Sequence, residues 1–300
     1  MQYRIFYLFA VTLVSACHYT SSKTEEIVTA QTSPKPSHDS LKLPLPYTTK
    51  SVFNFATVIG WPTGKTPQAQ PGFNITKISD SLNNPRWMYE GPNGDLFVSE
   101  ATIDPVVLKK FLSTISPKYK SMNFGNSANR ISLFRDTNGD GIYDLKTIFL
   151  QGLEQPFGML IIGKKFYVAN TNGIMVFPYE AGQLHISSPG KKILDLPAGG
   201  YNNHWTRNII VNRDSSKIYI SVGSGTNIAE HGMKNEEGRA CILEINPDGS
   251  GKKIFADGLR NPVGLAWAPE TETLWTAVNE RDELGDELVP DYLTSVQRNG

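Results

Sequence analysis

The chain lacks several features that would narrow its function at once. Its 300 residues carry no excess of either charge, with 29 Lys and Arg against 29 Asp and Glu, so composition gives no reason to expect a nucleic-acid partner. Only two cysteines are present. After the first seventeen residues no apolar run is long enough to span a bilayer, and helical periodicity is scarce. Turn-forming residues are plentiful, with 26 Gly and 19 Pro, which favours an all-β domain.

The N-terminus has the pattern of an export signal. Met1–Arg4 is basic, and Ile5–Val14 is an apolar run too short for a stable transmembrane helix. The run ends in Val14–Cys17, which resembles a bacterial lipobox. We expect residues 1–16 to be a lipoprotein signal peptide and Cys17 to be lipidated, with an ordinary secretory signal as the alternative. The protein would then be held at a membrane of the cell envelope by lipid alone, on the periplasmic or outer-membrane face.

The mature chain divides into a tether and a folded domain. Residues 17–50 are rich in Ser, Thr, Pro and Lys and are predicted to be a flexible tether. The domain is expected over residues 51–300. Cys241 lies in an alternating, strand-like run and is predicted to be a buried, unpaired thiol.

A recurring unit indicates the fold. Each copy has a polar or Pro-containing corner, an apolar strand, a turn and a strand with an aromatic residue; the copies span 84–100, 155–170, 204–223 and 261–279. Such turn-bounded repeats are typical of the four-stranded blades of a β-propeller. A β-sandwich is the alternative, but it needs no repeated strand pair.

The spacing of the repeats suggests an unfinished propeller. The aromatic residues taken as marking the closing strands, Phe97, Tyr167, Tyr219 and Trp275, are 52 to 70 residues apart. An insertion at 101–127, with a short helix over Pro105–Leu112, accounts for the longest interval. Four copies close a propeller poorly, so we expect a domain that is incomplete at the C-terminus, with about four to five blades.

A turn between two predicted strands has part of a calcium-binding pattern. Asp136, Asn138, Asp140 and Asp144 place oxygen ligands at positions 1, 3, 5 and 9, with Gly at position 6. The twelfth position is Thr147 in place of the usual Glu. The stretch therefore indicates either a possible calcium site or an ordinary Asp/Asn/Gly turn.

Polar residues at equivalent corners of the repeats are the candidate site. His204 can act as a general base near neutral pH, and Trp205 offers a ring for stacking on a sugar or a quinone. Arg260, beside Asn261, can stabilise an oxyanion or bind a carboxylate. Gln155 occupies the matching corner of an earlier repeat. Because propeller blades radiate from one axis, we expect these corners to meet there, although each residue could also be structural.

These stretches together resemble a known family. The segments NNHWTRNIIV, GRACILEINPDGSG, GLRNPVGLAWAP and NERDELGDELVPD are similar, in order, to the soluble sugar dehydrogenases that depend on pyrroloquinoline quinone (PQQ), and most closely to their sorbosone-dehydrogenase-like branch. The resemblance covers about 84–291. It implies a six-bladed propeller and oxidation of an aldose or sugar aldehyde by hydride transfer to the quinone.

The resemblance also implies roles for the corner residues. His204 matches the base that removes the substrate's hydroxyl proton. Arg260 and Asn261 match the pair that contacts PQQ, with the Arg stabilising charge at the C5 oxygen. Gln155 matches, more weakly, a residue that contacts substrate, and Trp205 is expected beside the cofactor. The sugar and an external electron acceptor would be the partners.

A calcium ion beside PQQ is implied as well. In the family it is bound partly by backbone carbonyls of the loop that corresponds to residues 279–286, so Glu280, Arg281 and Asp282 are the expected donors. Taken alone, this charged loop also fits a solvated turn. The family's basic residues for the PQQ carboxylates belong to later blades that the sequence does not include.

The sequence therefore favours a lipid-anchored, PQQ-dependent sugar dehydrogenase. Two other functions stay open. One is a non-catalytic propeller that binds carbohydrate or protein, since a fold does not define a function. The other is a calcium-dependent lactonase, which would place carboxylates where this chain has His204, Arg260 and Gln155.

Overall fold

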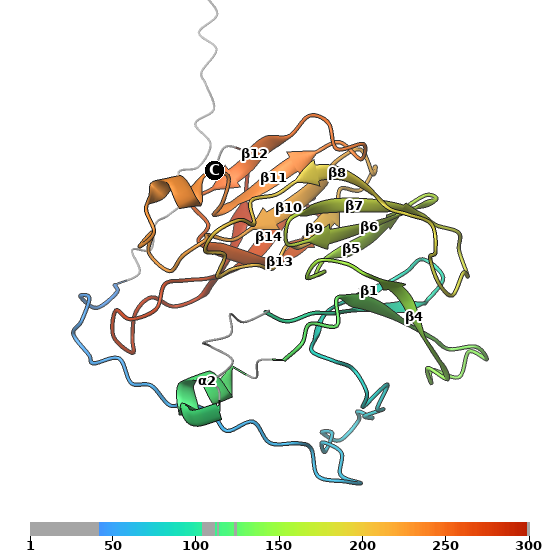
Figure 1. Ribbon diagram of the computed structural model, residues 1–300, viewed down its shortest axis with the longest axis horizontal. Coiled ribbons are helices and arrows are strands. Elements are labelled where there is room, and N and C mark those ends of the chain that lie inside the picture. Colours follow the sequence, from blue (N-terminus) through green and yellow to red (C-terminus); the bar gives the residue numbers. More distant parts are fainter. Residues whose placement is uncertain (1–41, 104–111, 113, 123–124, 299–300) are drawn as a thin grey trace, which may run out of the picture. The chain divides into compact units, whose positions relative to one another are not determined.

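The strands form antiparallel sheets that follow one another along the chain. The computed structural model describes residues 42–103, 112, 114–122 and 125–298. Within these ranges the regular secondary structure is almost entirely β, with four sheets arranged as the blades of a β-propeller (Figure 1). The propeller prediction is confirmed. Cys17, the signal peptide and most of the helix expected over 105–112 lie outside the described residues.

Each sheet is a meander in which consecutive strands pair. The first contains β1 (Pro85–Glu90), β2 (Leu96–Glu100), β3 (Arg130–Arg135) and β4 (Leu145–Gln151). The second contains β5 (Met159–Ile162), β6 (Lys165–Asn170), β7 (Gly173–Pro178) and β8 (Lys191–Asp195). The third contains β9 (Ile209–Val211), β10 (Ile218–Val222), β11 (Cys241–Ile245) and β12 (Lys253–Asp257). The fourth contains β13 (Asn261–Trp267), β14 (Leu274–Asn279) and β15 (Tyr292–Val296). The short helices α2 (Pro117–Ser121) and η1 (Met233–Glu236) lie in connections.

The aromatic markers of the repeat lie at the same place in every sheet. Phe97, Tyr167, Tyr219 and Trp275 are on β2, β6, β10 and β14, the second strand of each sheet. The expectation that these strands close the blades is wrong, because β3, β7, β11 and β15 follow and pair with them. The repeated signature therefore marks the first two strands of each sheet.

Apolar side chains fill the spaces between consecutive sheets. Phe97 and Phe149 of the first sheet pack against Phe166 of the second, with ring centroids 4.7 to 5.1 Å apart. Burying each such ring contributes about 1.5–3 kcal/mol. The inner strands β5 and β9 also contact each other. A Cβ at Gly158 would lie only 2.6 Å from the backbone N of Ile209, so glycine permits this close approach.

Cys241 is buried, as the alternating sequence predicts. It is 1% exposed on β11 and unpaired in the described part of the chain. Burial raises the pKa of its thiol to about 11, so it stays protonated and packs as a small apolar group.

The segment before β1 is extended and exposes apolar side chains. Nine lie between residues 52 and 78: Val52, Phe53, Phe55, Val58, Ile59, Trp61, Phe73, Ile75 and Ile78. Tyr47 N–H donates to Leu284 O at 2.7 Å, and Asp286 N–H donates to Thr49 Oγ1 at 3.0 Å. Among the described residues, Tyr47 and Thr49 are therefore hydrogen-bonded to the loop after β14.

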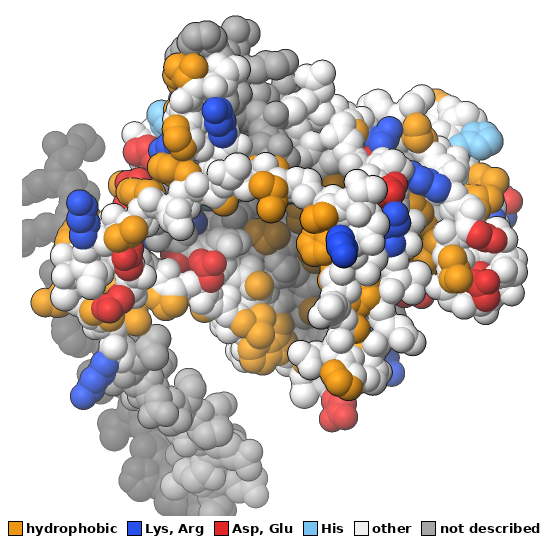
Figure 2. Space-filling view, turned by 90° about the horizontal axis from the view of Figure 1, so that it is seen from below, with side chains coloured by type: hydrophobic (Ala, Val, Ile, Leu, Met, Phe, Trp, Pro, Cys, Tyr) orange, Lys and Arg blue, Asp and Glu red, His pale blue; other side chains and the backbone are white. Residues whose placement is uncertain are grey.

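The surface has no single dominant charge on the face seen from below. There, acidic and basic side chains are interspersed, with hydrophobic side chains in separate patches between them (Figure 2). Among the residues that the structure describes, no helix has the length and apolarity needed to cross a bilayer.

Candidate functional site

A cavity of about 580 Å³ contains most of the predicted corner residues. His204, Trp205, Arg260 and Asn261 all line it. The wall also includes Arg86 and Trp87 at β1, Phe157 before β5, and Asn279, Glu280, Asp282 and Asp291 around the loop after β14. Equivalent corners of different sheets meet here, as expected for a propeller. The volume is in the range of small-molecule sites.

His204 is held from one side of its ring. Its Nδ1 lies 2.9 Å from the backbone O of Ser224 and 3.0 Å from the Oγ of the same residue. Burial, followed by the positive charge of Arg260, lowers the pKa of His204. Nε2 has no hydrogen-bond partner among the described residues. The imidazole is therefore neutral at neutral pH and has one free nitrogen, which suits a base.

Arg260 is fixed by oxygen acceptors of two loops. Its Nε and Nη2 donate to the backbone O and Oδ1 of Asn227, at 3.0 and 2.6 Å. Its Nη1 donates to the backbone O of Asn279 at 3.0 Å and to that of Glu280. Asp282 lies 3.8 Å from Nη2. The guanidinium is therefore a positive charge oriented before any ligand arrives.

Asn261 has an unsatisfied oxygen beside His204. Its side chain is 9% exposed, and Oδ1 has no hydrogen-bond partner in the part of the chain that the structure describes. A Cβ at Gly223 would lie 2.4 Å from this Oδ1 and 2.7 Å from the Cβ of His204. The glycine thus makes room for both side chains. An unpaired buried acceptor is costly, and Oδ1 is closed to solvent in this structure, so a ligand N–H or O–H would reach it only after the side chain moves.

Trp205 and Arg86 form a stacked pair in the wall. The Arg86 guanidinium carbon lies 5.1 Å from the centroid of the Trp205 ring, within cation–π range. Arg86 covers one face of the Trp205 ring, and Trp205 is 5% exposed. Arg86 has no ion pair with any described residue, and burial lowers its pKa. Arg86 is thus a wall cation without an ion pair in the described part of the chain.

Gln155 does not join the other corner residues. Its Nε2 donates to the backbone O of Thr102 at 3.0 Å, and its backbone N–H donates to Asn129 Oδ1 at 3.1 Å. Phe157, two residues later, lines the cavity instead. The structure thus brings together two of the three predicted corners, with four of their five residues, and a substrate contact for Gln155 stays a prediction.

The loop after β14 is tied to its surroundings by its backbone. Glu280 N–H donates to Asp291 Oδ1 at 2.9 Å, and Asp282 N–H donates to Asn227 Oδ1 at 3.1 Å. The carbonyl of Glu280, an expected calcium donor, accepts from Arg260, and that of Asp282 accepts from Arg281 Nε at 3.4 Å. Within the described ranges, no three His, Cys, Asp or Glu side chains are grouped as metal ligands. Calcium binding here stays a prediction.

The turn at 136–144 uses its oxygens internally. Asp136 accepts four backbone N–H groups, the shortest from Gly139 and Gly141 at 2.7 Å, and these bonds lower its pKa, Gly141 most. Asp140 accepts from Asn138 Nδ2 at 3.0 Å, and Asp144 accepts from the N–H and hydroxyl of Thr137. This is the bonding of an ordinary Asx-rich turn, so the predicted second calcium site gains no support.

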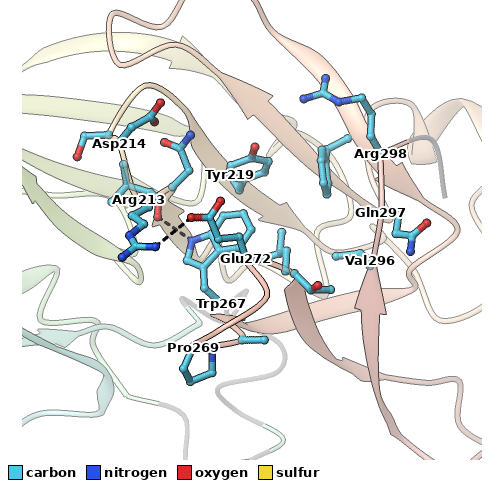
Figure 3. A pocket seen from close by; sticks show the side chains of 16 residues that line it. Arg213, Asp214, Tyr219, Trp267, Pro269, Glu272, Val296, Gln297 and Arg298 are labelled. Atoms are coloured by element: carbon cyan, nitrogen blue, oxygen red, sulfur yellow. Dashed lines mark hydrogen bonds and ion pairs between the residues drawn. The ribbon is translucent and has the colours of Figure 1, made fainter.

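A larger cavity of about 1230 Å³ lies elsewhere, between the β9–β10 and β13–β14 turns (Figure 3). Tyr219, Trp267 and Val296 contribute apolar walls, and Arg213 and Glu272 neutralise each other at 3.4 Å. Trp267 Nε1 is already bonded to Val211 O at 2.7 Å. None of the predicted site residues lines it. The smaller cavity has the reactive groups and is the candidate site.

Sequence reasoning missed several residues of the wall. Arg86 follows Asn84–Pro85 in the corner of the first repeat, so its position was a usable signal. Asn227, which fixes Arg260, and Ser224, which fixes His204, carry no motif. They follow β10 and become visible only through their hydrogen bonds.

The site fits a planar, anionic quinone such as PQQ on its own chemistry. Arg86 offers an unpaired cation for a carboxylate, and Asn261 Oδ1 lacks a donor in the described chain. Arg260 is a fixed positive charge for a carbonyl or oxyanion. The carbonyls of the 280–282 loop are the type of donor that calcium takes, although two of the three accept hydrogen bonds here.

Fold and cavity together define a β-propeller protein whose candidate site is built from corners of successive blades. A family model described as TrAA12-like matches residues 125–293. The chain belongs to this family.

Solved structures with this fold include sugar-oxidising enzymes. An iodide structure of family AA12 from Trichoderma reesei is 17% identical, with a TM-score of 0.59, covering 81% of this chain and 59% of that one. The PQQ domain of pyranose dehydrogenase from Coprinopsis cinerea is 16% identical, with a TM-score of 0.53, covering 77% and 53%. PQQ-bound aldose sugar dehydrogenase from Streptomyces coelicolor is 16% identical, with a TM-score of 0.51, covering 75% and 63%.

A curated relative has also been found. An uncharacterized protein of Borreliella burgdorferi is 26% identical over 152 residues, which are 48% of this chain and 39% of that protein. The chain thus spans less than two thirds of the length of each of these proteins.

Proposed function

We propose that this protein is a PQQ-dependent oxidoreductase that oxidises an aldose or a sugar aldehyde, as the sorbosone-dehydrogenase-like enzymes do. One observation carries the proposal. His204, whose Nε2 has no partner among the described residues, Arg260, which is fixed by its hydrogen bonds, and Asn261 line one cavity. His204 can take up a proton and Arg260 can stabilise negative charge in one and the same reaction, and this pairing favours catalysis over a purely structural role.

The residues of the cavity would have different roles. Arg86 and Asn261 would hold the cofactor, and the backbone of Glu280–Asp282 would hold calcium. When bound, PQQ supplies the two-electron acceptor for the hydride of the substrate carbon, and an external acceptor later takes these electrons. His204 accepts the hydroxyl proton at Nε2, which prevents charge from building up on the substrate oxygen. Arg260 supplies positive charge without reorganisation.

The location of this activity is part of the proposal. The apolar run Ile5–Val14 and the lipobox at Cys17 support a lipid anchor, so the protein would oxidise sugar at the cell envelope. The protein would then bind its substrate outside the cytoplasm.

The test uses the whole chain with PQQ and calcium. Quinone binding is measured by fluorescence titration, and turnover by reduction of an artificial acceptor with a panel of aldoses. His204→Ala should lower turnover by about 10²- to 10⁴-fold and leave quinone affinity nearly unchanged. His185→Ala, at an exposed position, is the matched control and should change neither. Failure to bind quinone would contradict the proposal and favour a non-catalytic propeller.

A further inference from the structure

The bonds at His204 Nδ1 define which nitrogen carries the proton. The backbone O of Ser224, at 2.9 Å, can only accept a hydrogen bond, so Nδ1 must donate to it. The Ser224 hydroxyl donates to Thr226 O at 2.7 Å, which leaves its Oγ as a second acceptor for Nδ1 at 3.0 Å. Both contacts require the Nδ1–H tautomer. In the neutral ring, Nε2 is then unprotonated.

Ser224 is itself held by the segments around it. The Ser224 N–H donates to Arg260 O at 2.7 Å. Ser224 therefore contacts both His204 and Arg260 of the cavity wall. The carboxylate of Glu236 accepts from Gly225 N at 2.6 Å and from Thr226 Oγ1 at 2.5 Å. The backbone of the 224–226 segment is thus fixed on both sides of the contact with His204.

The support for His204 is neutral. In the described part of the chain no carboxylate contacts Nδ1. Burial, followed by the charge of Arg260, lowers the pKa of His204, while the hydrogen bond to the Ser224 carbonyl and the charges of Asp282 and Glu236 raise it. The other charged groups of the cavity are Arg86, Glu280 and Asp291. Ser224 therefore orients the ring without adding the negative charge that would favour the imidazolium.

We propose that Ser224 is a positioning residue that holds His204 in its Nδ1–H tautomer, with Nε2 as the proton acceptor. The consequence for turnover rests on the proposed function. The tautomer itself is a property of the protein without cofactor and can be measured there.

The first experiment reads the tautomer directly. The full chain, with its five histidines labelled with ¹⁵N, is studied by NMR without PQQ above pH 7, and His204→Ala identifies the His204 signals. The expected result is a protonated Nδ1 and an unprotonated Nε2. The reverse pattern would overturn the proposal. Because no cofactor is present, this outcome is independent of whether the protein is an oxidoreductase.

Variants of Ser224 separate positioning from folding. Ser224→Ala keeps the backbone acceptor but loses Oγ, so a fraction of the Nε2–H tautomer should appear and kcat should fall about fivefold with KM unchanged. Ser224→Thr keeps a hydroxyl and should restore both. A loss in Ser224→Ala that Ser224→Thr does not restore would contradict a positioning role.

Ser224→Asp tests the neutral support. A carboxylate beside Nδ1 should keep the tautomer and raise the pKa of His204, moving the acid limb of turnover to higher pH. A circular dichroism spectrum like that of the wild type excludes misfolding. An unchanged pKa in this folded variant would show that residue 224 does not face the ring, which would also overturn the proposal.

Discussion

The corner of His204 and the turn at 136–144 are both rich in polar residues, but they differ in which atoms are left without partners. In the turn, Asp136 accepts four backbone N–H groups. In the cavity, Asn261 Oδ1 and His204 Nε2 have no partner among the described residues. Residue types alone suggest ligand binding in both places. The hydrogen bonds of each polar atom therefore distinguish a turn that uses its oxygens internally from a cavity whose residues have polar atoms without partners.

The largest effect on quinone affinity is expected from filling the space at Gly223. A methyl group in Gly223→Ala would collide with Asn261 Oδ1 and His204 Cβ, so we expect quinone affinity to fall about 10- to 100-fold. Fluorescence titration measures it. Gly199→Ala is the control, because no described atom lies within 4 Å of its Cβ position. Equal affinities in the two variants would show that the corner is not a crowded site.

Removing the unsatisfied oxygen should separate stability from binding. In Asn261→Leu the unpaired acceptor disappears, so the free energy of unfolding should not decrease, whereas quinone affinity should fall about tenfold. Thr276 Oγ1 is another buried atom without a partner in the described chain, and Thr276 does not line the cavity. Thr276→Val should therefore be equally well tolerated and leave affinity unchanged. Urea unfolding measures the stability of both variants, and fluorescence titration measures their quinone affinity.

The pH dependence of turnover should reflect the lowered pKa of His204. Because burial and Arg260 lower the pKa of His204, the acid limb of kcat should lie below about pH 6.5, the ordinary value. The same shift makes the contribution of His204 to stability full above the unfolded pKa, and this contribution is lost as the pH falls through the lower folded pKa. In Arg260→Gln the limb should move to higher pH. A limb that stays in place would contradict the assignment of His204 as the base.

The smallest effect is expected in the turn. Asp136→Asn should lower Tm slightly near neutral pH and leave quinone affinity unchanged. The stabilising bonds of the Asp136 carboxylate are present above its unfolded pKa and are lost as the pH falls through the lower folded pKa, so the difference in Tm should disappear in acid. If calcium raises the Tm of the wild type but not of Asp136→Asn, the turn is a calcium site after all.

Much of the fold was predictable, because the inner strands carry a repeated pattern of turns and apolar residues. His204, Arg260 and Asn261 could be grouped because equivalent corners of a propeller meet. Gln155 follows the same pattern but bonds to Thr102, and its φ of 46° belongs to a turn that redirects the chain. Ser224 could not be predicted, because its importance comes from contacts with a ring twenty residues away.

The cavity draws its wall from Arg86 in the first sheet, Phe157 beside the second, His204 beside the third and Asn261 in the fourth. These residues are far apart in sequence, so the site can form only after the blades have docked, which makes it a late event in folding. A ligand that binds only the assembled wall stabilises the docked blades by mass action. Raising its concentration should therefore delay thermal unfolding of the propeller as a whole.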